Sequence, residues 1–119
     1  MKKTLVIGAS ENPERYAFKA MTSLSKHGVE NIGLGLKEGE VAGSKIVTGK
    51  PQFTDIDTVT LYVGTRNQGE WIDYLIGLKP KRIIFNPGTE NPEFYAKATK
   101  AGIECVEGCT LVMLSIGNF

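Results

Sequence analysis

The sequence has few of the residues on which disulfide and metal chemistry depend. Its 119 residues include one histidine, His27, and two cysteines, Cys105 and Cys109. Two cysteines four positions apart are too few for the disulfide framework of a small secreted protein. A single histidine is a poor nucleus for a metal site. The apolar stretch Thr4–Gly8 is too short for a signal peptide. We therefore expect a cytoplasmic protein without a metal centre.

The sequence also lacks an excess of charge of one sign and any long apolar run. A net charge of +1 creates no overall field that would recruit nucleic acid or an anionic membrane. No run approaches the roughly 20 apolar residues that a membrane-spanning helix needs. The length suits one hydrophobic core, so we expect a single domain over residues 1–119 without a nucleic-acid or membrane partner.

Short β-branched runs alternate with helical patterns along the chain. Strands are predicted at Thr4–Ile7, Asn31–Leu34, Ile46–Val47, Thr58–Val63, Arg82–Phe85 and Ile103–Val106. Helices are predicted around Ala17–Leu24, Trp71–Ile76, Pro92–Ala101 and Cys109–Ile116. We expect a loop over Gly35–Gly43 and an edge strand at Ile46–Val47. The alternation predicts a doubly wound, mostly parallel, Rossmann-like α/β sheet of about five strands with helices on both faces.

The first strand runs into a turn that is typical of a phosphate-binding site. Gly8, Ala9 and Ser10 follow the strand, and Asn12 and Arg15 precede the helix. Free backbone N–H groups and the positive end of a helix dipole would meet there. The complete dinucleotide fingerprint is missing, because Ser10 and Pro13 replace two of its glycines.

Three more segments rich in glycine, small polar residues or lone cations follow strands, where α/β sheets bind ligands. The first is Gly35, Leu36 and Lys37. It has no acid before Glu38 to hold the ribose hydroxyls of NAD, and Lys37 suits a phosphorylated ribose, as in NADP or coenzyme A. The other two segments are Val63–Asn67 and Asn86–Glu90.

Structural interpretations of the same residues remain open. Arg15 is either a phosphate ligand or a surface ion-pair partner. Ser10 and the run Asn86–Gly88 are equally suited to turning the chain. Lys37 and Arg66 are also typical of solvated loop cations.

At the level of motifs the chain resembles the small, free-standing CoA-binding domains of bacteria, similar to the N-terminal domain of the succinyl-CoA synthetase α subunit. The matching runs are Val6–Ser10, Asn12–Tyr16, Val59–Val63 with Asp57 before it, Asn86–Asn91, and Gly102-Ile103 leading to Cys109. The run Asn86–Asn91 is the most specific. One departure is Gly35-Leu36, where the family often has Asn-Pro.

The resemblance implies a ligand, coenzyme A or an acyl-CoA, and assigns residues to its parts. Gly8, Ala9, Ser10, Asn12 and Arg15 would lie along the pyrophosphate. Gly35, Leu36 and Lys37 would lie near the adenosine and its 3′-phosphate. Val63, Gly64, Asn86, Pro87 and Gly88 would border the adenine or the pantetheine.

Three functional hypotheses follow. The first is a non-catalytic CoA-binding, sensor or regulatory module, with a second copy of itself or an enzyme subunit as possible partner. The second is an NADP-dependent reductase fragment or the nucleotide-binding subunit of a CoA ligase. The third is a redox responder in which Cys109, before a predicted helix, is a reactive thiol. For both Cys109 and Cys105 the alternative is packing as a small apolar side chain.

Overall fold

The computed structural model describes residues 3–119, which form one seven-stranded sheet. Its strands are β1 (Thr4–Ala9), β2 (Asn31–Gly35), β3 (Gly39–Val41), β4 (Ser44–Val47), β5 (Thr58–Leu61), β6 (Arg82–Phe85) and β7 (Glu104–Glu107). Its helices are α1 (Tyr16–Lys26), α2 (Ile72–Gly77), α3 (Pro92–Lys100) and α4 (Thr110–Ser115), with a 3₁₀ turn, η1, at Thr65–Asn67. No helix in this part of the chain is long and apolar enough to cross a membrane.

The strand order is β3-β4-β2-β1-β5-β6-β7, and all neighbours pair in parallel except β3 with β4. The predicted doubly wound α/β fold is therefore confirmed, with more strands than the five expected. The prediction of a loop over Gly35–Gly43 was wrong, because Gly39–Val41 forms the antiparallel edge strand β3. The prediction of an edge strand at Ile46–Val47 was also wrong, since β4 lies between β3 and β2.

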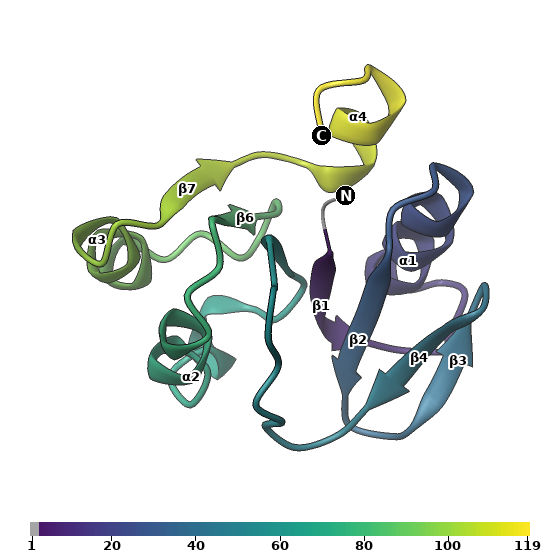
Figure 1. Ribbon diagram of the computed structural model, residues 1–119, viewed down its shortest axis with the longest axis horizontal. Coiled ribbons are helices and arrows are strands. Elements are labelled where there is room, and N and C mark those ends of the chain that lie inside the picture. The colour runs from purple at the N-terminus through teal and green to yellow at the C-terminus, as the bar shows by residue number, and fades with distance from the viewer. Residues whose placement is uncertain (1–2) are drawn as a thin grey trace.

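Two apolar cores cover the two faces of the sheet. The side chains of β1 alternate between them: Leu5 and Ile7 pack with α2 and α3, whereas Val6 packs with α1 and α4. Figure 1 shows α1 and α4 together at one side of the molecule and α2 and α3 at the other. This alternation is what a strand buried on both faces requires.

The predicted helix patterns are confirmed where they were most regular. The buried side chains of α1 are Ala17, Ala20, Met21 and Leu24, the apolar face that the sequence spacing predicts. Helix α3 starts as predicted: Asn91 Oδ1 accepts a hydrogen bond from the Phe94 N–H, and Pro92 occupies the first turn. Asn91 and Pro92 together fix the point at which the chain turns from the loop after β6 into the helix.

The order of the strands defines a switch point at β1. From β1 the chain proceeds through α1 to β2 on one side, and later returns through β5 to the other side. The carboxyl ends of β1 and β5 lie beside each other there, in the position where open α/β sheets bind their ligands.

Candidate functional site

The turn after β1 is stabilised by its own side chains. Ser10 Oγ accepts a hydrogen bond of 3.0 Å from the Asn12 N–H, and Asn12 Oδ1 accepts one of 3.0 Å from the Glu14 N–H. The Arg15 N–H donates to the Asn12 carbonyl at 3.0 Å. The expectation that the turn presents free N–H groups therefore needs correction: those of Asn12, Glu14 and Arg15 are used within it.

Backbone N–H groups without a side-chain cap lie instead at the start of α1. Arg15 is the N-cap residue, and since its guanidinium has only hydrogen-bond donors it cannot cap the N–H groups of the helix; no acid occupies the first turn. In contrast, α3 has an asparagine cap and Glu93 in its first turn. Because first-turn N–H groups have no partners inside a helix, α1 presents donors and a positive dipole end beside the exposed Arg15 side chain.

Close backbone packing brings three of the strand-end segments together. Gly8 has φ +89°, and a Cβ there would lie 2.8 Å from the Tyr62 carbonyl oxygen and 3.1 Å from Val63 Cγ2. A Cβ on Gly35 would overlap the Ala9 carbonyl oxygen. Only glycine fits at both positions, so the ends of β1, β2 and β5 approach one another at Gly8 and Ala9.

The residues after β2 are exposed. Leu36 is 98% exposed, although it is a large apolar side chain, and Lys37 beside it is exposed as well. The structure places both directly beyond the end of β2, next to Gly35. An apolar side chain so completely exposed at a strand end is free to contact an apolar part of a ligand.

Asn86 lies after β6 as predicted but points into the protein and is only 1% exposed. Its Nδ2 donates to Thr60 Oγ1 at 2.7 Å and to the Leu61 carbonyl at 2.8 Å, and its Oδ1 accepts from the Thr110 N–H at 2.9 Å. Asn86 thus joins β5, β6 and α4. The following Pro87 and Gly88 remain exposed.

Sequence reasoning did not identify Gln68, which connects two of the strand-end loops. Its side chain is fully buried, donates to the carbonyls of Val63 and Thr89 at 2.9 and 2.8 Å, and accepts from Asn91 Nδ2 at 3.0 Å. Gly64, next to Val63, is exposed. A loop glutamine is usually solvated, so its type alone gives no signal of this role.

Tyr62 and Cys109 lie near each other on the α4 side of the sheet. The Tyr62 hydroxyl is buried and forms no hydrogen bond of ordinary geometry with any part of the chain that the structure describes. Burial raises its pKa to about 12 despite the nearby hydroxyls of Thr110 and Thr60. Cys109 is the half-buried N-cap residue of α4 and is a free thiol. Cys105 is also free and half-buried, so it is less buried than predicted.

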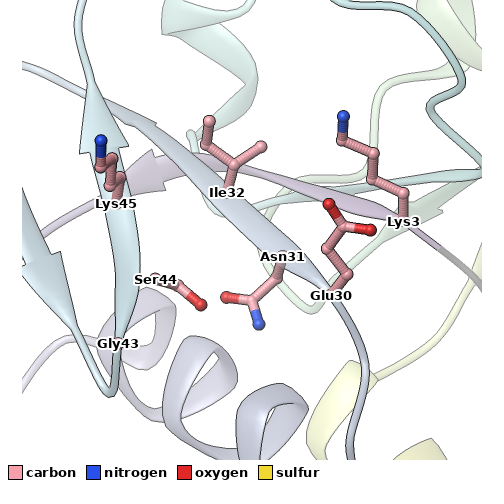
Figure 2. A pocket seen from close by; sticks show the side chains of 7 residues that line it. All are labelled: Lys3, Glu30, Asn31, Ile32, Gly43, Ser44 and Lys45. Atoms are coloured by element: carbon pink, nitrogen blue, oxygen red, sulfur yellow. The ribbon is translucent and has the colours of Figure 1, made fainter.

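A hollow of about 310 Å³ lies at the opposite, amino ends of β2 and β4, lined by Lys3, Glu30, Asn31, Ile32, Gly43, Ser44 and Lys45. Figure 2 shows Asn31 and Ser44 facing each other across the gap between the two strands. The hollow contains none of the predicted site residues. In residues 3–119 no three metal-ligating side chains form a cluster, and His27 Nδ1 is 2.8 Å from the Ser23 carbonyl oxygen.

Solved structures resemble the whole chain. A crystal structure of an uncharacterized protein is 51% identical, with a TM-score of 0.96, over 100% of this chain and 98% of that one. A hypothetical protein from Pyrococcus horikoshii OT3 is 31% identical, with a TM-score of 0.84, over 97% and 82% of the two chains. A Thermus thermophilus structure shares the fold at 21% identity, with a TM-score of 0.83 over 99% and 90%.

A comparison with curated proteins found no match. The sequence profile of the CoA binding domain matches residues 2–115, nearly the full length of the chain. This match includes the turn after β1, the exposed segment after β2 and the loops after β5 and β6. The chain therefore belongs to the CoA-binding domain family.

Proposed function

We propose that the chain binds coenzyme A or an acyl-CoA across the carboxyl ends of β1, β2, β5 and β6, as a non-catalytic binding, sensor or regulatory module. The observation that carries the proposal is the exposed, uncapped N-terminus of α1 at the switch point, in a chain of the CoA-binding domain family. A helix end of this kind is a general binding site for phosphate groups.

The pyrophosphate is proposed to lie against the first turn of α1. The N–H groups of that turn and the Arg15 guanidinium would donate to the phosphate oxygens, since charge-assisted hydrogen bonds are the stronger kind. Ser10 Oγ accepts from the turn, so its hydroxyl proton remains available to a phosphate oxygen. Gly8, Ala9 and Asn12 would shape the turn that the pyrophosphate crosses.

The adenosine is proposed to lie beyond the end of β2. Gly35 keeps the backbone close to Ala9, and the exposed Leu36 would cover an apolar surface of the adenosine. Lys37 would provide the charge for the 3′-phosphate. The pantetheine arm would then pass Val63, Gly64, Pro87 and Gly88, while Asn86 and Gln68 hold the loops that carry these residues.

These groups bind and hold a nucleotide rather than transfer protons, which is why the proposed role is that of a binding module. We also propose that the protein is bacterial and cytoplasmic, and that its partner is a second copy of itself or an enzyme subunit.

Titration calorimetry with coenzyme A, dephospho-CoA, acetyl-CoA, NAD and NADPH tests the proposal. We expect coenzyme A to bind more tightly than dephospho-CoA, and Lys37→Ala to remove most of that difference. Lys45→Ala is the matched control, because Lys45 is an exposed lysine at the opposite ends of the strands. Binding of NADPH alone would support the reductase hypothesis instead.

A further inference from the structure

We infer that Glu11 is a positioning residue that holds the phosphate turn, residues 8–15, against the β3–β4 hairpin in the conformation that binds CoA. The inference rests on the proposed function. It concerns a contact between two segments that lie far apart in the sequence.

Glu11 projects from the turn onto the edge of the sheet. Its Oε2 accepts a hydrogen bond of 2.9 Å from the N–H of Glu40, 29 residues further along the chain. Glu40 lies in β3, which pairs with β4 on one side and is an edge of the sheet on the other. An edge strand exposes backbone N–H groups that need a partner, and a carboxylate is a strong acceptor for one of them.

Gly39 leaves the space in which the Glu11 side chain lies. A Cβ on Gly39 would be 2.5 Å from Glu11 Cδ and 2.7 Å from Oε2, too close for the present arrangement. Gly39 does not have a left-handed φ, so an alanine would fit its backbone and would displace the carboxylate instead. The glycine and the glutamate are therefore two halves of one contact, which we call the Glu11 latch.

The latch joins β3 to the middle of the turn, which other contacts leave exposed. The turn is packed against Tyr62 at Gly8, and it enters α1 after Arg15. Between these points the hydrogen bonds of the Ser10 and Asn12 side chains join residues only two positions apart. A long-range contact at Glu11 reduces the number of conformations of this segment before a ligand binds, which raises the population that is competent to bind.

Charge repulsion and positioning predict opposite effects of Glu11 removal on the affinity for CoA, so an experiment can distinguish them. A carboxylate beside a phosphate site repels an anionic ligand, so its removal alone would strengthen CoA binding. If the latch positions the turn, removal of Glu11 weakens binding in spite of the lost repulsion.

The experiment compares four variants by titration calorimetry with coenzyme A. Glu11→Ala removes both latch and charge, and Gly39→Ala breaks the latch but keeps the charge. We expect the dissociation constant to rise about five-fold in both, the factor that corresponds to roughly 1 kcal/mol. Glu11→Gln retains an acceptor oxygen for the Glu40 N–H and should bind at least as tightly as the wild type. Glu14→Ala, which removes an exposed acid from the same turn, is the charge control and should not weaken binding.

Hydrogen exchange of the Glu40 amide gives a readout that needs no ligand. Exchange should be faster in Glu11→Ala and Gly39→Ala than in the wild type and in Glu11→Gln. If the wild type binds CoA and Glu11→Ala binds it equally or more tightly, the inference is wrong. If the wild type does not bind CoA, the proposed function fails, and the positioning role fails with it. Unchanged exchange in both latch-breaking variants would likewise overturn the inference.

Discussion

Replacement of Asn86 by alanine should reveal how the site is held together. The side chain forms three buried hydrogen bonds, to Thr60, Leu61 and Thr110, that join two strands to α4. Each buried hydrogen bond contributes about 1 kcal/mol net, and a buried group left without a partner costs about 1–3 kcal/mol. The Thr110 N–H and the Leu61 carbonyl would both lose the Asn86 partner. We therefore expect Asn86→Ala to lower the free energy of unfolding by about 3 kcal/mol.

Urea unfolding followed by circular dichroism measures this loss as a lower midpoint with an unchanged slope. Asn67→Ala is the control, since Asn67 is an exposed asparagine in η1 and its loss should change stability by less than about 0.5 kcal/mol. Asn86→Asp should also lose stability at neutral pH, because a carboxylate cannot donate to the Leu61 carbonyl. Equal midpoints for Asn86→Ala and Asn67→Ala would refute the structural role that the hydrogen bonds assign to Asn86.

Three further outcomes are expected from the geometry. Tyr62→Phe should leave stability at pH 7 unchanged or higher, because the buried hydroxyl forms no hydrogen bond of ordinary geometry within residues 3–119. The wild type should lose stability between pH 10 and 12, because Tyr62 ionises in the unfolded chain while burial raises its pKa in the folded protein to about 12. Tyr62→Phe should lose less stability over this range, and an unaltered alkaline profile would contradict this. Cys109 should react with iodoacetamide faster than Cys105, whose pKa is raised by burial, and mass spectrometry of a peptide digest would detect the reverse order. Gly8→Ala should destabilise the protein by about 2 kcal/mol or more, because φ +89° and the nearby Tyr62 carbonyl both exclude a Cβ, and an unchanged melting temperature would contradict the packing.

The elements with strong local signals were predictable from the sequence. The apolar spacing of α1 and the Asn91-Pro92 start of α3 depend on neighbouring residues, so they can be recognised without knowledge of the rest of the fold. The antiparallel strand β3 was not predictable. It is three residues long and begins with a glycine, and its position depends on pairing with β4 and on Glu11.

The candidate site was predictable in position but not in detail. The four strand-end segments follow from the alternation of strands and helices, because parallel strands place their carboxyl ends at one edge. Residue types did not show that Asn86 turns inward or that Gln68 is buried, since each side chain has partners more than 20 residues away in the sequence. The roles of Ser10 and Asn12 were not predictable from the sequence either, because a serine and an asparagine fit a phosphate contact and a turn equally well, and here both side chains accept hydrogen bonds within the turn.

The most direct test of CoA binding at the switch point is a titration of ¹⁵N-labelled protein with coenzyme A, followed by amide chemical shifts. Binding at this site should produce saturable shifts in residues 8–18, with further shifts at 35–37, 63–64 and 87–88. Shifts confined to the hollow between Lys3 and Lys45, or no shifts at millimolar coenzyme A, would contradict it.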